Sequence, residues 1–262
     1  MTNQPSILTE IKGPVAHVFL NRPEFHNALN GKMIQALLEQ LEILDSNRSI
    51  RIIALRGKGN SFCAGADINW MRMAQHLSEE ENYRECQLLA KTFYSLYKSS
   101  KITVAFIHGN IFGGAIGLFA SCDLAIATTN AVFAFSEVRL GLVPATIMPY
   151  VLNKTGNRVV ERMLTGIKFK SGDAEAIGLV NAVVQDEAFE SALNETLASL
   201  LEAAPEAQRR IKLQARTLIM PAITEDLVNH TAGLLAETRI SKEALEGLGA
   251  FSEKRKPAWQ QA

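Results

Sequence analysis

Two clusters of very small residues, each following an apolar run typical of a β-strand, constrain this chain most strongly. Residues 51–57 (RIIALRG) lead to residues 62–67 (FCAGAD), and residues 102–109 (ITVAFIHG) lead to residues 112–117 (FGGAIG). Glycine and alanine let the backbone itself come within hydrogen-bonding distance of a ligand. A helix that begins behind each turn adds unpaired N–H donors and the positive end of a dipole. The pattern predicts two turns that can direct two backbone N–H groups at one oxygen atom.

Small residues in such clusters have a second interpretation, because they also let a helix and a strand pack closely against each other. A single short motif of this kind is weak support for a binding site. The presence of two clusters at comparable places, with a glutamate downstream, favours the ligand-binding interpretation.

The composition is that of an ordinary globular protein. The chain has 262 residues, 47% of them hydrophobic, which suffices for a sizeable core. Its 27 Lys and Arg residues balance its 27 Asp and Glu residues, so no overall field favours nucleic acid or an anionic membrane. We expect neither nucleic acid nor membrane as a partner.

Targeting and cysteine patterns point to a reducing, cytoplasmic location. The N-terminus has no basic-then-apolar signal pattern, and no apolar run of about 18 residues is present. Cys63, Cys86 and Cys122 form no C-x-x-C spacing, which predicts neither a disulfide framework nor a zinc site.

Strand and helix patterns alternate along the first two thirds of the chain, as in an α/β protein. Residues 7–20 predict a hairpin, residues 21–30 a loop, and Asn30 an N-cap for a helix with one apolar face. Further strands are expected at residues 51–56, 102–107, 123–128, 131–135 and 181–184. Residues 83–97 predict a helix, residues 74–82 a mobile polar segment, and residues 187–251 several amphipathic helices.

Residues 57–62 (GKGNSF) nearly match a dinucleotide-binding fingerprint, but Phe62 stands where the third glycine should be. The chain has no G-x-S-x-G, H-E-x-x-H or P-loop motif. The common hydrolase, zinc protease and P-loop interpretations are therefore not supported.

Glu137 is the strongest candidate for proton transfer. It follows an aromatic, apolar strand and precedes a Gly-Leu-Val-Pro turn. Apolar neighbours such as Phe135 and Val138 should desolvate its carboxylate and raise its pKa toward values useful in catalysis. The alternative is a structural ion pair between Glu137 and Arg139 or another cation; the two N–H turns favour the catalytic role.

The segments FCAGADI, GNIFGGAIGLFASCDLAIA, FSEVRLGLVP and AFSEKRKPAW, in this order and spacing, resemble the crotonase, or enoyl-CoA hydratase/isomerase, superfamily. The resemblance covers essentially the whole chain. It implies an α/β, ClpP-like crotonase fold of repeated β-β-α units in residues 1–195. It also implies a helical C-terminal trimerisation region in residues 196–262, with trimers that often pair into hexamers.

The same resemblance implies an acyl-CoA thioester substrate and no cofactor beyond the coenzyme A that the substrate carries. Carried over residue by residue, the oxyanion hole falls on the N–H groups of Ala66 and Gly114, and the catalytic carboxylate on Glu137. Candidate contacts to substrate and CoA are Glu24, Ala28, Ala64, Asp67, Ile68, Phe112, Gly113, Gly117 and Lys254. No metal site is expected.

One departure from the hydratases with two glutamates matters for the reaction. Their first catalytic glutamate falls at Gly117 here, while the second falls at Glu137. A single carboxylate is the arrangement of the double-bond isomerases. Yet residues 136–151 (SEVRLGLVPATIMPYV) and the C-terminal segment look most like hydratases of methylglutaconyl-CoA and γ-carboxygeranoyl-CoA.

The favoured expectation is therefore hydration of a branched, carboxylated 2-enoyl-CoA. The alternatives are isomerisation of a 3-enoyl-CoA to a 2-enoyl-CoA and a non-catalytic acyl-CoA-binding protein.

Overall fold

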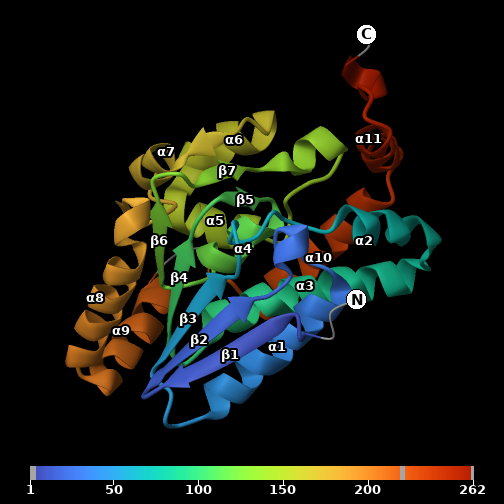
Figure 1. Ribbon diagram of the computed structural model, residues 1–262. Helices are drawn as coiled ribbons and strands as arrows, with labels where there is room; N and C mark the ends of the chain where they lie inside the picture. The colour runs from blue at the N-terminus through green and yellow to red at the C-terminus, as the bar shows by residue number, and fades with distance from the viewer. Residues whose placement is uncertain (1–3, 219–221, 261–262) are drawn as a thin grey trace.

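A six-stranded sheet forms the centre of the molecule (Figure 1) in a computed structural model that describes residues 4–218 and 222–260. The strand order is β1-β2-β3-β4-β6-β9, with β1 and β2 antiparallel and every later pair parallel. The strands are β1 (Ile7–Lys12), β2 (Val15–Leu20), β3 (Ile52–Gly57), β4 (Ile102–Ile107), β6 (Leu124–Thr128) and β9 (Ala182–Val184). The predicted hairpin and the expected strands of this sheet are confirmed within one residue or two at their ends.

A second, three-stranded sheet contains β5 (Asn110–Phe112), β7 (Val132–Ala134) and β8 (Phe169–Lys170). Two successive strand pairs, β4–β5 and β6–β7, each give one strand to the large sheet and one to the small sheet. This is the α/β crotonase architecture of β-β-α units that the sequence predicted. The sequence did not predict β5 and β8, which have only three and two residues.

Helices cover both faces of the large sheet (Figure 1). On one face, α8 (Phe189–Glu202) packs Leu193 and Leu197 against strand residues such as Val104 and Phe106. On the other face, the main core includes the apolar sides of α1 (Gly31–Ser46) and α3 (Glu79–Lys98). The loops at the strand ends, where the small sheet begins, are thus fixed between packed layers.

Capping residues set the starts of both helices. Asn30 caps α1 by accepting a hydrogen bond from the Met33 N–H, as predicted. Ser78 and Glu81 form a capping box that begins α3 at Glu79. The helix expected at residues 83–97 therefore starts earlier, at Glu79. The prediction of a polar loop at residues 74–82 is partly wrong. Its first residues form η2 (Ala74–His76), and its last belong to α3.

The described part of the C-terminal third is helical, as the sequence predicted. Residues 219–221 lie outside the described residues. The long helix α10 (Glu225–Arg239) packs along α3, where the buried Asn82 amide donates to the Ala236 carbonyl. The remaining helices are α2 (Ile68–Met73), α4 (Gly114–Ala120), α5 (Met148–Thr155), α6 (Val160–Thr165), α7 (Ser171–Ala176), α9 (Pro205–Leu218) and α11 (Lys242–Ser252). In Figure 1, α11 lies at the edge of the molecule near the C-terminus.

The predicted boundary between residues 195 and 196 falls inside α8, and its position stays a prediction. Short 3-10 turns complete the chain: η1 (Pro23–Phe25), η3 (Ser136–Leu140), η4 (Gly156–Val159), η5 (Asp186–Ala188) and η6 (Ala258–Gln260). Within residues 4–218 and 222–260, no helix is both long and apolar enough to cross a membrane.

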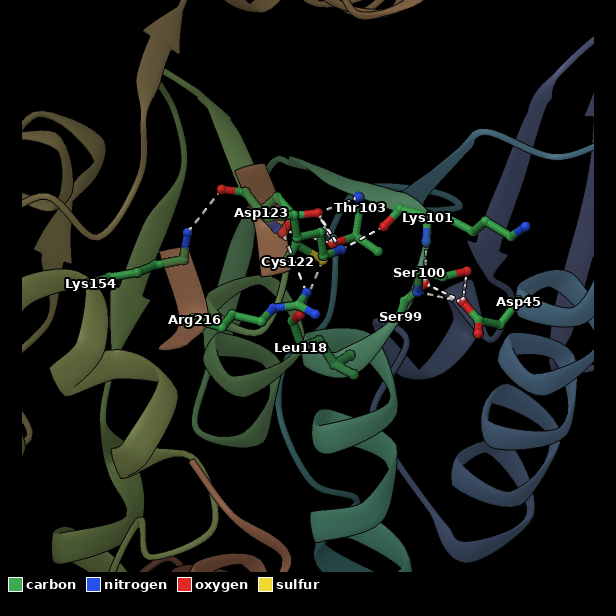
Figure 2. A network of polar contacts seen from close by, with 11 residues as sticks. Asp45, Ser99, Ser100, Lys101, Thr103, Leu118, Cys122, Asp123, Lys154 and Arg216 are labelled. Atoms are coloured by element: carbon green, nitrogen blue, oxygen red, sulfur yellow. Dashed lines mark hydrogen bonds and ion pairs between the residues drawn. The ribbon is translucent and has the colours of Figure 1, made fainter. Parts of the chain in front are cut away.

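Asp123 joins α9 to the core at the start of β6 (Figure 2). Its Oδ2 accepts hydrogen bonds from the backbone N–H and the hydroxyl of Thr103 and from Lys212 Nζ. Arg216 lies 3.6 Å from its Oδ1. Because Lys212 and Arg216 both come from α9, one carboxylate holds this helix to the sheet.

Candidate active site

The two small-residue turns lie side by side, although 44 residues separate them in the sequence. An isolated β-bridge joins Cys63 in the first turn to Ile111 in β5. Gly65 has a φ of 99°, and a Cβ added there would lie 2.7 Å from the Phe112 carbonyl oxygen. Glycine is therefore required at this position by both backbone conformation and close contact. The close contact at Gly65 is between the first turn and β5, and this packing brings the two turns together.

The backbone leaves the N–H group of Ala66 without a partner. Leu29 donates its N–H to the Gly65 carbonyl, and Asp67 donates its N–H to the Leu29 carbonyl. In this parallel bridge the residue between Gly65 and Asp67 directs its own N–H away from Leu29. No described residue accepts a backbone hydrogen bond from Ala66.

The N–H group of Gly114 is free for a different reason. Gly114 is the first residue of α4, where an N–H has no carbonyl four residues earlier in the helix to bind. The preceding Gly113 has a φ of 52° and donates its N–H to the Ala134 carbonyl instead. Within the described residues, the Gly114 N–H has no backbone acceptor. Both N–H groups predicted for an oxyanion hole are therefore available.

The loop at residues 21–30 supports the first turn. Asn27 is fully buried, has a φ of 56°, and donates its side-chain amide to the carbonyls of Lys58 and Ser61. Arg22 donates to the Ala28 carbonyl and forms an ion pair with Asp67 at 3.1 Å. These contacts fix the loop, so the position of Ala66 does not depend on a ligand.

Glu137 lies beside the second turn, in η3, directly after the strand β7. A Cβ on Gly113 would come within 3.0 Å of Glu137 Oε1, so the carboxylate lies against the bare Cα of that glycine. Its Oε2 is covered and has no hydrogen-bond partner among the described residues. Arg139 does not pair with it and instead donates to the Thr165 carbonyl. The structure does not form the Glu137–Arg139 ion pair that was the alternative.

Burial among apolar groups raises the pKa of Glu137 from 4.5 to about 7, while a hydrogen bond from its own backbone N–H opposes the shift. Desolvation disfavours the charged form of a carboxyl group, which is the physical cause of the increase. A group with a pKa near neutrality can both accept and release a proton at physiological pH. The environment of Glu137 thus suits general acid–base catalysis.

Two cavities meet at these groups. The outer cavity, of about 680 Å3, runs between the residue 21–30 loop, the two turns and the residues around α11. The inner cavity, of about 60 Å3, lies behind them and is lined mainly by apolar side chains from α2, α3, α10 and the turn after η3. Five residues line both cavities: Ala66, Met71, Gly114, Glu137 and Leu142. The free N–H groups and the carboxylate therefore lie at the junction.

Most of the candidate residues from the sequence line the outer cavity. They are Ala28, Ala64, Ala66, Asp67, Ile68, Phe112, Gly113, Gly114 and Glu137. Asp67 also caps α2 and binds Arg22, so its carboxylate is already committed to structural contacts. Glu24 and Lys254 are exposed and do not line this cavity. Arg255 lines it instead, but binds Glu246 and Glu253.

Gly117 lies away from both cavities, buried in α4. A Cβ at this position would collide with Ile147 Cγ2 and come within 3.0 Å of the Phe93 ring. A contact between substrate and Gly117, as the sequence suggested, has no support in this arrangement. The space that a side chain here would need is filled by neighbouring apolar groups.

Several cavity residues were not anticipated from the sequence. Lys168 lines the outer cavity, with its ammonium group 5.3 Å from the Phe112 ring. Trp70, Thr146 and Arg239 line the inner cavity. They come from segments far apart in the chain, so no local motif marks them. Among the residues that the structure describes, no group of three or more His, Cys, Asp or Glu could hold a metal ion.

Known proteins are similar to this chain over most of its length. Residues 10–262 match the family model described as enoyl-CoA hydratase/isomerase. An enoyl-CoA hydratase of Alternaria alternata, AKT6-1, is 32% identical over 250 residues, covering 94% of this chain and 81% of its own.

Solved structures agree over the whole fold. An enoyl-CoA hydratase from Shewanella pealeana has a TM-score of 0.79 at 35% identity, over 97% of this chain and 96% of its own. An enoyl-CoA hydratase from Mycobacterium avium has a TM-score of 0.84 at 30% identity, over 98% and 99%. The chain belongs to the enoyl-CoA hydratase/isomerase family of enzymes.

Proposed function

We propose that this protein adds water across the double bond of a 2-enoyl-CoA whose acyl group is short, branched and carboxylated, such as methylglutaconyl-CoA. The observation that carries the proposal is the junction of the two cavities, where two free N–H groups and one protonatable carboxylate converge. The thioester lies at this junction, with CoA in the outer cavity and the acyl group in the inner one.

The N–H groups of Ala66 and Gly114 bind the thioester oxygen. When water attacks the β-carbon, the double-bond electrons move toward the thioester and negative charge develops on this oxygen. Donors that are already fixed in place stabilise that charge without reorganisation. Because the charge is larger in the transition state than in the bound substrate, these bonds increase the rate and not only the affinity.

Glu137 transfers the proton. Its carboxylate accepts one hydrogen from the water whose oxygen bonds to the β-carbon, and the enolate then takes a proton from the resulting carboxylic acid at the α-carbon. The net change is the addition of one water molecule, and Glu137 returns to its ionised form. No cofactor is needed, because the thioester supplies the electron-accepting group.

The outer cavity suits the pantetheine and nucleotide parts of CoA. Phe25, Phe112 and Phe251 provide apolar surface, while Arg139 and Lys168 provide positive charge along the same cavity. Lysine and arginine bind phosphate through charge-assisted hydrogen bonds. Lys254 stays a candidate only if it reaches the site of a neighbouring subunit.

The inner cavity supports a short acyl group with a polar end. Its volume of about 60 Å3 excludes a long acyl chain unless side chains move. Arg239 is the only Lys, Arg or His among its lining residues. The guanidinium group lies 4.4 Å from the Trp70 ring centroid and binds Glu85 at 2.8 Å. The N–H groups of Arg239 that Glu85 and the Trp70 carbonyl leave free are fitting partners for a carboxylate on the acyl group.

Incubation with 2-enoyl and 3-enoyl thioesters in water enriched in heavy oxygen tests the reaction. Hydration incorporates the heavy oxygen at the β-carbon. Glu137→Gln should reduce turnover about 10²- to 10⁴-fold while leaving CoA-ester binding nearly unchanged. Tight binding of CoA esters without turnover of any of them would contradict the proposal.

Isomerisation of a 3-enoyl-CoA is the second candidate, and the packing at Gly117 favours it. That packing leaves Glu137 as the only carboxylate among the lining residues of the inner cavity. One carboxylate can move a proton from the α-carbon to the γ-carbon without water. Migration of the double bond with no incorporation of heavy oxygen would establish this reaction in place of hydration.

A panel of branched enoyl-CoA esters, with and without a terminal carboxylate, tests the acyl group. One charge-assisted hydrogen bond to Arg239 should raise kcat/KM for the carboxylated ester about tenfold to a hundredfold. Equal kcat/KM values for matched pairs of esters would contradict the carboxylated substrate while leaving hydration intact.

We also propose that the helices of residues 196–262 make subunit contacts in a trimer or a hexamer. Large apolar side chains there are exposed in the single chain, among them Ile211, Leu245, Phe251 and Trp259. Exposed apolar groups in such numbers are typical of a surface that another chain covers. Light scattering coupled to size-exclusion chromatography gives the mass, and a monomer at micromolar concentration would contradict this proposal.

A further inference from the structure

Hydration with a single carboxylate leaves one requirement unmet at the junction. The attacking water has two hydrogens, and Glu137 can accept only one of them. A second acceptor must hold the other hydrogen so that an oxygen lone pair faces the β-carbon. Position 117 on α4 cannot provide it, because Ile147 and Phe93 close the space around Gly117.

Most other polar side chains of the inner cavity cannot serve as this acceptor. Arg239 has no acceptor atom, and it is occupied by Glu85 and by the Trp70 carbonyl. Trp70 offers only an indole N–H, which donates. Cys86 is buried, and its thiol is a weak acceptor.

Thr146 differs from these groups. It lines the inner cavity together with Glu137, and only 3% of its surface is exposed. Within the described part of the chain, its hydroxyl has no hydrogen-bond partner. The hydroxyl oxygen is not among the unpartnered buried side-chain atoms of the described residues, so it keeps some open surface, and Thr146 lines the same cavity as Glu137.

The backbone holds Thr146 in place. The turn that carries it is closed by hydrogen bonds from the N–H groups of Ile147 and Met148 to the Pro144 carbonyl, at 3.2 and 3.1 Å. The neighbouring Ile147 is the residue that fills the space over Gly117. One turn therefore fills the space beside Gly117 and carries Thr146, which lines the inner cavity.

We propose that Thr146 is a catalytic residue whose hydroxyl oxygen accepts a hydrogen bond from the attacking water. The water directs one hydrogen to Thr146 Oγ1 and the other to a carboxylate oxygen of Glu137, and its oxygen bonds to the β-carbon. The proton that Glu137 takes returns to the α-carbon. Thr146 gains and loses no proton in this step. This inference rests on the proposed hydration and deepens it.

Thr146→Val tests the assignment, because valine keeps the shape of threonine and replaces the hydroxyl with a methyl group. Two reactions are measured. The first is hydration of a 2-enoyl-CoA; the second is exchange of the α-hydrogens of the matching saturated acyl-CoA with heavy water. Exchange needs Glu137 and the two N–H groups but no attacking water. Thr146→Ser, which retains a hydroxyl, is the matched control.

In Thr146→Val we expect kcat for hydration to fall about ten- to a hundredfold, with KM and α-hydrogen exchange within about twofold of the unchanged protein. Thr146→Ser should recover most of the hydration rate. Hydration within twofold of normal in Thr146→Val, or an equal fall in hydration and exchange, would overturn the role of Thr146. If the unchanged protein exchanges α-hydrogens but hydrates no ester, the proposed function itself is wrong.

Discussion

The side chain of Ile147 lies directly over the Cα of Gly117 and occupies the space that any side chain at position 117 would need. Phe93, from α3, closes the other side. The absence of a carboxylate at position 117 therefore involves more than this one residue, because Ile147 and Phe93 fill the space that a side chain would need there. A glutamate placed at position 117 alone would have no room, and Glu137 is the only carboxylate among the described residues that line the inner cavity.

Gly117→Ala should destabilise the protein. Overpacking a filled core costs about 1–3 kcal/mol, while replacing glycine by alanine within a helix gains up to about 1 kcal/mol. We expect the free energy of unfolding to fall by about 1 kcal/mol, measured by urea denaturation. Ile147→Ala supplies the control, because the double variant should be more stable than the sum of the two single effects predicts. Additive effects would contradict the contact between these residues.

The pH dependence of hydration should report Glu137. Its pKa is raised to about 7 by burial, and the reaction needs the ionised form to accept a proton from water. Below pH 7, kcat/KM should therefore fall about tenfold for each pH unit, and above pH 7 this group should cause no further increase. A midpoint near 4.5, the ordinary value for glutamate, would contradict the desolvated carboxylate.

Glu137 should also make the stability of the protein depend on pH. A carboxyl group with a higher pKa in the folded state binds more protons when folded, so its ionisation destabilises the fold as pH rises from 4.5 to about 7. The full effect is about 3 kcal/mol, since one pKa unit corresponds to about 1.4 kcal/mol.

Glu137→Gln removes this ionisation and keeps the shape of the side chain. It should raise the thermal midpoint relative to the unchanged protein at pH 8, by several degrees, and have little effect at pH 4. An equal change in midpoint at both pH values would mean that the difference does not come from ionisation of Glu137. Together with lost turnover, the expected result would show a site that is less stable than its inactive variant.

The sequence predicts those parts of the candidate site that lie within local motifs. Small residues identify Ala66 and Gly114, because only such residues permit the turns in which their N–H groups stay free. Glu137 is recognisable from its apolar neighbours in the sequence, such as Phe135 and Val138. The same local patterns gave the large sheet and the cap at Asn30.

Residues that depend on packing between distant segments could not be found in this way. Thr146 and Arg239 reach the inner cavity from the turn after η3 and from the end of α10, and neither carries a motif of its own. The start of α3 was missed because the acidic run before Tyr83 reads as a polar loop. Only the capping box of Ser78 and Glu81 shows that it opens a helix. The strand β8 has only two residues, too few to show the alternation of apolar and polar residues that identifies a strand in a sequence.

Asp123→Asn should loosen α9 from the sheet (Figure 2). Lys212, whose side chain is 5% exposed, and Arg216 both direct their charge at this carboxylate. Burial lowers the pKa of Lys212, and the charge of Asp123 opposes that effect. Without the carboxylate, two largely buried cations remain close together, and breaking such a pair costs about 3–5 kcal/mol. We expect a loss near the lower end, about 3 kcal/mol in urea, because Asp123 is partly exposed.

Lys212→Met in the Asp123→Asn background separates charge from packing. Removing one of the two uncompensated cations should recover part of the stability that Asp123→Asn loses, whereas Lys212→Met alone should destabilise the protein. Hydrogen exchange should show the loss of protection in Asp123→Asn concentrated in α9 and at the start of β6. A uniform loss across the molecule, or a double variant less stable than Asp123→Asn, would show that Asp123 does not act by compensating these cations.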